Sequence, residues 1–219
     1  MSLSAEPALR PERIRISGQT VVLEPLDPVR HAEGLWLAAG GPALADLWQW
    51  MSDGPFPDRA SLEASLAGKA VSEDPLFYAI ADARTGTALG LASFLRIDTS
   101  HRVIEVGSIM YGPALQRSRA GTEAMYLMMR YAFDELGYRR YEWKCNALNT
   151  PSRRAALRYG FRFEGIFRQH MIIKGQNRDT AWFSILDSEW PALKANFERW
   201  LAPANFDASG QQLTSLRKS

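Results

Sequence analysis

The sequence predicts an α/β protein with a mixed, mostly antiparallel central sheet of about seven strands and helices on both faces. Strand-type segments joined by short turns follow one another between residues 77 and 111. After residue 136, strand-type and helical segments alternate and a long hairpin follows. Between these two parts lies an amphipathic helix that ends at Gly137, with apolar residues at helical spacing: Met125, Met128, Met129, Ala132 and Leu136.

The other elements follow from local patterns. Runs of β-branched and aromatic residues bounded by turn residues indicate strands at 13–16, 21–24, 77–81, 88–97, 103–111, 140–145, 161–173 and 180–186, the last two joined by a turn over 174–179. Helices are expected to begin at Pro28, near Asp58, at Gly121, at Asn149 or Thr150, and at Ser188. Pro151 suits a first helical turn, where its missing N–H needs no partner.

Length and composition favour one soluble domain. Hydrophobic residues make up 46% of the 219 residues, which is enough for a full core. No apolar run approaches the roughly 18 residues that a membrane span needs, so no membrane association is expected. We expect a disordered lead over residues 1–12, a domain over 13–201 and a mobile tail over 202–219. The N-terminus lacks the pattern of a secretory signal, which favours a cytoplasmic location.

Charge and ligand-type residues exclude several classes of function. The net charge of +2 is spread along the chain, unlike the concentrated basic surface of a nucleic-acid binder. Cys145 is the only cysteine, so it cannot form an internal disulfide. The three histidines, His31, His101 and His170, show no metal-ligand spacing. We therefore expect neither a disulfide framework nor a metal site.

The loop before the central helix is the first candidate site. Strand 103–111 leads through Gly112-Pro113 into residues 116–121, directly before the N-terminus of that helix. Free amides at a helix N-terminus attract phosphate, and Arg117 and Arg119 add full positive charges. A pyrophosphate would fit there. An ordinary strand-to-helix loop with two solvated arginines explains the same residues equally well.

These residues resemble a motif of the GNAT superfamily of N-acetyltransferases, especially the branch of ribosomal-protein N-terminal acetyltransferases. That motif is Gln/Arg-x-x-Gly-x-Gly/Ala, and the branch commonly continues with Thr-Glu-Ala. The matching residues are Gln116, Gly121, Thr122, Glu123 and Ala124. Arg119 stands at the inner glycine position, where a positive φ would be strained.

A second block supports the same resemblance. Asn149 and Ser152 are followed by the run Ala155–Phe161, by Phe163-Glu164-Gly165 and by Arg168. Both blocks occur at the family spacing, and the resemblance is specific over residues 103–170.

The resemblance implies a cofactor site for acetyl-CoA, the co-substrate, and no metal. The sheet would splay open between strands 103–111 and 140–146, with the pantetheine arm in the gap. The arm would pair with the backbone of Ile109, Met110 and Tyr111, and its thiol end would lie near Asn149 and Ser152. The backbone amides of one loop would hold the pyrophosphate: Gln116, Arg117, Ser118, Arg119, Ala120, Gly121 and Thr122.

The implied reaction is attack of a neutral amine on the thioester carbonyl, through an oxyanion stabilised by the amide of Met110 or Tyr111. An acid should then protonate the departing thiolate. Many relatives use a tyrosine four residues before the Gly of the Gly-Phe pair, but here that residue is Ala156. In the ribosomal-protein branch a serine can serve, and Ser152 is at the matching position. A helix-capping or packing role for Ser152 remains the alternative.

The base and the acceptor pocket are less well defined. Glu105 lies in an apolar strand, where a carboxylate tends to titrate nearer neutrality, although a buried ion pair is equally consistent. His170 is a second candidate base, but a strand histidine is more often a packing or surface residue. Trp48, Trp50 and Phe56 are candidates to line the acceptor pocket, although such aromatics more often pack in a core or lid.

The predicted function is therefore N-acetylation of a primary amine, either a protein N-terminal α-amine or a small molecule, by a monomer or homodimer. Arg119 and the missing tyrosine motivate one alternative, a catalytically degenerate CoA-binding regulatory protein. A plain α/β scaffold without a ligand is the other.

Overall fold

The protein is described by a computed structural model over residues 6–216. Two compact units divide the chain, the first ending at Tyr138 and the second beginning at Arg139. The expected α/β class is confirmed, with eight strands in the described residues where about seven were expected. None of the helices in this range is long and apolar enough to cross a membrane.

The first unit contains an antiparallel meander in which each strand pairs with the next one along the chain. Its strands are β1 (Ile16–Ser17), β2 (Val21–Pro25), β3 (Leu76–Asp82), β4 (Ala88–Asp98) and β5 (Val103–Tyr111). The strand predicted from Arg13 begins only at Ile16, because Ile14 turns back and its N–H donates to the Glu12 carbonyl.

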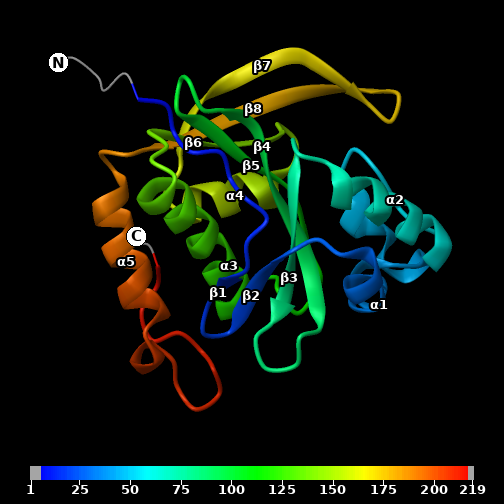
Figure 1. Cartoon of the computed structure of the whole chain (residues 1–219), viewed down its shortest axis with the longest axis horizontal. Helices are drawn as coiled ribbons and strands as arrows, with labels where there is room; N and C mark the ends of the chain where they lie inside the picture. The colour runs from blue at the N-terminus through cyan, green and yellow to red at the C-terminus, as the bar shows by residue number, and fades with distance from the viewer. Residues whose placement is uncertain (1–5, 217–219) are drawn as a thin grey trace. The chain divides into compact units, whose positions relative to one another are not determined.

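Three helices of the first unit begin where side chains cap their first amides. They are α1 (Pro28–Ala39), α2 (Arg59–Val71) and α3 (Arg119–Arg130), and a π-helical turn (Tyr131–Glu135) continues α3. The Asp27 and Asp58 carboxylates cap α1 and α2. Ser118 caps α3, so this helix begins two residues before the predicted Gly121. Helices α1 and α2 lie on one face of the meander and α3 lies on the other (Figure 1).

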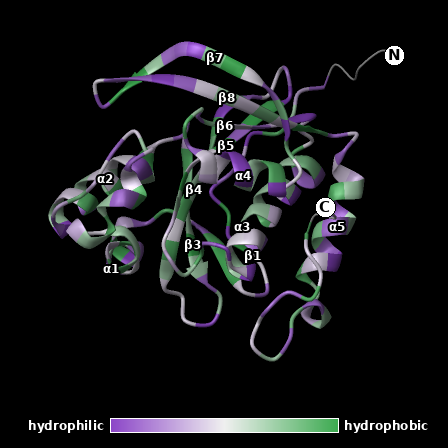
Figure 2. Ribbon diagram, turned by 180° about the vertical axis from the view of Figure 1, so that it is seen from behind, coloured by the Kyte–Doolittle hydropathy of each residue, from purple (hydrophilic) through white to green (hydrophobic). Residues whose placement is uncertain are grey.

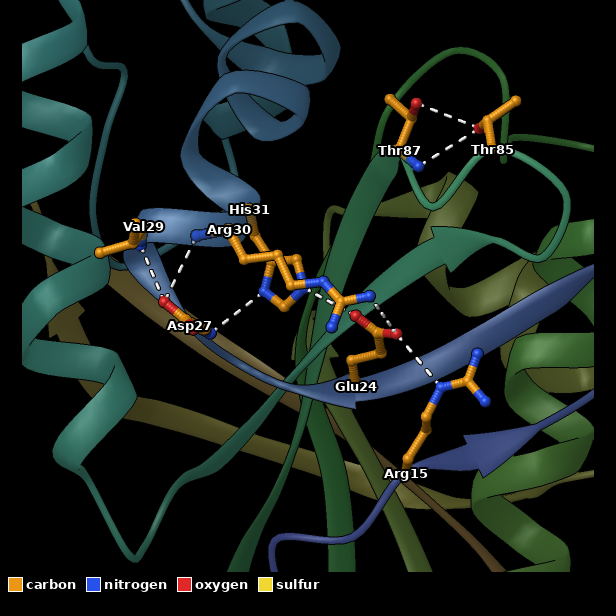
Figure 3. A network of polar contacts seen from close by, with 8 residues as sticks. All are labelled: Arg15, Glu24, Asp27, Val29, Arg30, His31, Thr85 and Thr87. Atoms are coloured by element: carbon orange, nitrogen blue, oxygen red, sulfur yellow. Dashed lines mark hydrogen bonds and ion pairs between the residues drawn. The ribbon is translucent and has the colours of Figure 1, made fainter.

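A buried charge joins α1 to β2 (Figure 3). The Glu24 carboxylate accepts hydrogen bonds from Arg15 (3.2 Å) and Arg30 (3.0 Å) and lies 3.0 Å from His31 Nε2. The Asp27 N–H donates to His31 Nδ1, which places the ring proton on Nε2, facing Glu24. Burial raises the pKa of Glu24, but hydrogen bonds from His31 and Arg15 and the charge of Arg30 outweigh it and hold the pKa below its usual value.

The second unit has a three-stranded antiparallel sheet in the order β6-β8-β7. Its elements are β6 (Arg140–Asn146), α4 (Thr150–Arg158), β7 (Arg162–Ile173), β8 (Gln176–Leu186) and α5 (Trp190–Leu201). Strands β7 and β8 form a long curved hairpin (Figure 1). Hydrophilic residues occupy the middle of β7, between two more hydrophobic stretches (Figure 2).

The turn of this hairpin was predicted over residues 174–179 but consists of Lys174 and Gly175. Both residues have a positive φ, 50° and 73°. A two-residue turn of this kind matches the twist of the flanking strands, so pairing resumes at once and β8 begins at Gln176. The polar residues 176–179 therefore belong to the strand.

Both ends of the described residues make defined contacts, where a disordered lead and a mobile tail were predicted. Ala8 is buried, its N–H donates to the Thr99 carbonyl, and the N–H of Leu9 donates to the Leu136 carbonyl. Beyond α5, Trp200 donates from its indole N–H to Gln212 and Leu216 is buried. Apolar residues at both ends drive this docking. Residues 1–5 and 217–219 lie outside the described part of the chain.

Candidate cofactor site

The predicted phosphate loop is held together by its own side chains. Ser118 Oγ donates to the Leu115 carbonyl (2.8 Å) and accepts from the Gly121 N–H (2.9 Å). Gln116 Nε2 donates to the Tyr111 carbonyl (2.9 Å), which connects the loop to the end of β5. The loop therefore enters α3 along a defined path.

The left-handed residue of this loop is Arg117, with a φ of 55°. Arg119 stands at the inner glycine position of the motif, where the sequence indicated that a positive φ would be strained, and the structure places the left-handed residue elsewhere. Arg119 is the first residue of α3, so its backbone is helical, and its guanidinium donates to Gln19 Oε1 (2.7 Å). The chain reverses two residues earlier, at an exposed arginine. A strained residue at such a position is a frequent feature of ligand-binding loops.

Only part of the predicted amide cradle can reach a ligand. The N–H groups of Gln116 and Ser118 donate within the loop, and that of Gly121 is capped by Ser118. The Thr122 N–H donates to the Ser118 carbonyl (3.3 Å), as expected inside a helix. Within residues 6–216, no hydrogen-bond acceptor of this kind is found for the backbone N–H groups of Arg117 and Ala120. Seven amides were expected to hold the pyrophosphate. Four of them donate within the protein, and the candidates that remain lie just before and within the first turn of α3.

Gly121 allows the helix to pack closely on the loop. A Cβ at this position would lie 2.2 Å from the Leu115 carbonyl oxygen and 3.0 Å from the Tyr111 ring. The Tyr111 hydroxyl donates to the Gly121 carbonyl (2.9 Å), so strand, loop and helix meet at one residue. The glycine is required here by lack of space.

Glu123 and Thr122 have structural roles. The Glu123 carboxylate is buried and accepts from the backbone N–H groups of Gln19 (2.7 Å), Thr20 (2.6 Å) and Val21 (3.2 Å), which form the turn between β1 and β2. Thr122 Oγ1 donates to the Ser118 carbonyl (3.0 Å). These two motif residues therefore shape the unit rather than offer groups to a ligand.

Strand β5 bulges just before the residues expected to pair with pantetheine. Ser93 is the partner of Gly107 and Leu91 that of Met110, so β5 has one residue more than β4 in this interval. Ser108, in the bulge, has a φ of 48°. The fully buried Ser93 hydroxyl donates to the Gly107 carbonyl (3.1 Å) and stabilises the bulge. The sequence analysis missed Ser93, whose only signal was a hydroxyl within a largely apolar strand.

Glu105, the first candidate base, forms the buried ion pair considered as its alternative. Its side chain is 4% exposed, and Arg96 Nη1 donates to its Oε2 (2.8 Å). Oε1 lies on the Gly107 side, 3.4 Å from where a Cβ of that residue would stand. Oε2 of Glu105 is thus paired with Arg96, while Oε1 lies beside Gly107, the residue that precedes the β5 bulge.

In the second unit, Ser152 lies in the first turn of α4. Asn149 caps the helix, and its Oδ1 accepts from the Ser152 N–H (3.0 Å), which leaves the Nδ2 group as the part of Asn149 that can reach a ligand. The Ser152 hydroxyl oxygen accepts from the indole N–H of Trp143 (3.0 Å). Trp143 was not singled out by its sequence, because its partner lies on another element.

His170 has a packing environment. Its exposed ring lies edge-on to Phe167 (5.6 Å between centroids) and 5.9 Å from the Trp182 ring, and Nδ1 is 3.0 Å from the Thr180 hydroxyl. These contacts match the packing alternative.

Trp48 and Phe56 are buried in the core of the first unit, which matches the packing alternative, and their assignment to an acceptor pocket stays a prediction. Trp48 is 1% exposed, its indole N–H donates to the Ala39 carbonyl (2.7 Å), and its ring meets Phe56 edge-on at 4.8 Å. Gly54 packs against the same ring. Trp50 is half-buried, and its role stays a prediction. Across residues 6–216, no three His, Cys, Asp or Glu side chains gather in a way that could hold a metal ion.

Comparison with known proteins identifies the family of this chain. The acetyltransferase (GNAT) domain family matches residues 21–162. A GCN5-related N-acetyltransferase from Brucella melitensis is 51% identical, with a TM-score of 0.94 over 96% of each chain. The Bacillus subtilis protein YdaF, named as a candidate ribosomal N-acetyltransferase, is 30% identical over 79% of this chain and 93% of its own.

A more distant structure shares the fold. It is that of the microcin C7 self-immunity acetyltransferase MccE in complex with acetyl-CoA and AMP, at 20% identity and a TM-score of 0.63, covering 77% of this chain and 93% of its own. The family match and the YdaF relative each span most of the chain. This chain belongs to the GNAT family of acetyltransferases.

Proposed function

We propose that this protein transfers the acetyl group of acetyl-CoA to a primary amine. The observation that carries the proposal is the loop before α3, where the cap by Ser118, the left-handed Arg117 and the close packing at Gly121 fix the path of the chain into the helix N-terminus. Family membership supports acetyl transfer, and the chemistry of the loop supports a pyrophosphate-bearing donor. The amides of Arg117 and Ala120 and the charge of Arg117 are assigned to that pyrophosphate.

The bulge of β5 supports the pantetheine assignment. A bulge interrupts the regular ladder and re-aims backbone groups, and here it immediately precedes Ile109, Met110 and Tyr111. We assign the backbone of these three residues to the pantetheine arm, and the amide of Met110 or Tyr111 to the oxyanion.

The proposed reaction is direct transfer. The neutral amine attacks the thioester carbonyl carbon, a C–N bond forms, and the C–S bond breaks with its electron pair on sulfur. Ser152 gives its hydroxyl proton to that sulfur, and Glu105 takes the proton that the amine loses, directly or through water. Arg96 holds the Glu105 carboxylate in place through Oε2, and the position of Oε1 beside Gly107, next to the β5 bulge, supports its assignment as the base.

The name of the YdaF relative makes the N-terminus of a ribosomal protein the first acceptor to test. Small amines are the second class. Release of free CoA thiol should be followed with peptides that carry protein N-termini, and with amino acids, polyamines and aminoglycosides.

Binding and turnover are tested separately. A ligand that binds only the native state at about 100 times its Kd stabilises it by roughly 2.7 kcal/mol, so acetyl-CoA should clearly raise the Tm. The absence of a shift at millimolar acetyl-CoA would refute the donor assignment. A shift without thiol release for any amine would support the regulatory CoA-binding alternative instead.

A further inference from the structure

The hydrogen bond between Trp143 and Ser152 defines the direction of the serine hydroxyl. Trp143 is buried on β6, and its Nε1 lies 3.0 Å from Ser152 Oγ. An indole N–H can only donate, so the serine oxygen must accept. The single hydroxyl hydrogen of Ser152 therefore points away from Trp143, toward an acceptor other than the indole.

We propose that Trp143 is a positioning residue for proton donation by Ser152, holding the hydroxyl as a donor and stabilising its oxygen once the proton has left. This inference rests on the proposed acetyl transfer and adds a residue that the reaction needs. A hydrogen bond to an oxygen strengthens as negative charge develops there, so the indole N–H favours the state after donation over the state before it.

Both partners of this hydrogen bond are fixed. The Trp143 ring packs edge-on against Phe161 (5.5 Å between centroids) and tilted against Tyr159 (6.1 Å). The Ser152 backbone is held by the cap from Asn149. Neither group needs to reorganise when charge appears on the serine oxygen, and such preorganisation is what makes a fixed donor effective in catalysis.

The surroundings of Ser152 also contain a sulfur atom. Burial raises the pKa of the Cys145 thiol, and the hydrogen bond that Ser152 donates to it acts in the opposite direction. A neutral thiol accepts this hydrogen more weakly than a thiolate would, so the Ser152 hydroxyl can turn from Cys145 to the departing sulfur of CoA.

The proton balance of the step is closed. When the C–S bond breaks, its electron pair goes to sulfur, the Ser152 O–H bond breaks, and an S–H bond forms. The serine oxygen is left negative and accepts from Trp143 Nε1–H, which keeps its own proton. The proton that Glu105 takes from the attacking nitrogen is then passed through water to Ser152, which restores both groups, so that amine and acetyl-CoA yield amide and free CoA thiol.

Trp143→Phe tests the inference, because phenylalanine keeps an aromatic ring but lacks the N–H. With the acceptor found by the thiol-release screen, kcat should fall about tenfold to a hundredfold, the range for one hydrogen bond to a charged group. The KM for acetyl-CoA should stay within about twofold, since the serine hydroxyl remains. Trp200→Phe is the matched control: it removes a buried indole N–H bonded to Gln212 and should leave kcat unchanged.

A double-mutant cycle separates positioning from general packing. In a Ser152→Ala background, Trp143→Phe should have no further effect on kcat, because the group it positions is gone. An equal loss in both backgrounds, or wild-type kcat in Trp143→Phe, would overturn the inference. Wild-type protein inert toward all amines would instead overturn the proposed function.

A second variant applies if Trp143→Phe unfolds. Replacement of Trp143 by benzothienylalanine keeps the shape of the indole while sulfur takes the place of the N–H. It should show the same loss of kcat at an unchanged Tm, and full activity of this protein would overturn the inference.

Discussion

Glu123 should be one of the most sensitive positions for stability in the first unit, although it belongs to a motif associated with the cofactor. Its carboxylate is 4% exposed and accepts from three successive backbone N–H groups, those of Gln19, Thr20 and Val21. Glu123→Ala would leave these donors without their acceptor in a buried place. The turn between β1 and β2 would then lose its attachment to α3.

The expected loss follows from these contacts. A hydrogen bond to a charged group contributes about 1.5–3 kcal/mol, but such contributions do not add fully within one network. Removing one partner from a buried charged network costs about 3–5 kcal/mol, and we expect Glu123→Ala in this range. Glu123→Gln keeps one acceptor oxygen but turns an N–H₂ group toward backbone donors, so about 2–3 kcal/mol should be lost.

Urea unfolding followed by circular dichroism measures this loss. For a chain of this size each kcal/mol corresponds to roughly 2–4 °C in Tm, so Glu123→Ala should melt about 6–20 °C below the wild type. Glu135→Gln is the matched control, an exposed carboxylate in the π-helical turn after α3, 4.0 Å from Arg130. It should stay within about 0.5 kcal/mol of the wild type. A Glu123→Ala protein as stable as this control would refute the reasoning.

Three further predictions concern other positions. Gly121→Ala should abolish the thermal shift by acetyl-CoA, because its Cβ would lie 2.2 Å from a backbone oxygen of the loop; a normal shift would show that the loop adjusts. Ser93→Ala should fold normally and raise the KM for acetyl-CoA about fivefold, the value of one hydrogen bond, and an unchanged KM would contradict a role for the β5 bulge. The folded pKa of Glu24 is lowered, so its stabilisation is present above its unfolded pKa near 4.5 and is lost as the pH falls through the folded value. Glu24→Gln should therefore show a flatter fall in stability between about pH 5 and pH 3, and a fall as steep as that of the wild type would refute this linkage.

Features that depend on neighbouring residues could be predicted from the sequence. Pro28 begins α1 as expected, because a proline suits the first turn and Asp27 supplies the cap. The helix capped by Asn149 was predicted for the same kind of reason. Runs of β-branched and aromatic residues between turn residues identified β3, β4 and β5 to within a residue or so at each end. All of these signals lie within a few positions of the element they specify.

Features that depend on partners far away in the sequence could not be predicted from it. Ser108 adopts a positive φ because β5 carries one residue more than β4 at that point, which no local pattern in β5 reveals. The carboxylate of Glu123 binds residues about a hundred positions earlier in the chain. Trp48 and Phe56 have the composition of a binding surface, but their burial depends on how the segment before α2 folds over the core of the first unit.

The loop before α3 shows what its motif specifies. Of the matched residues, Gln116 ties the loop to β5, Gly121 provides room for close packing, and Glu123 anchors the helix to another turn. These side chains define the shape of the loop, and the backbone around Arg117 is the part that we propose for the ligand. An arginine at position 119 is compatible with this shape, because the left-handed residue is Arg117 and Arg119 already lies in the helix. The departure from the family pattern at Arg119 therefore does not argue against a phosphate site, since the conformation for which the glycine is needed occurs elsewhere in the loop.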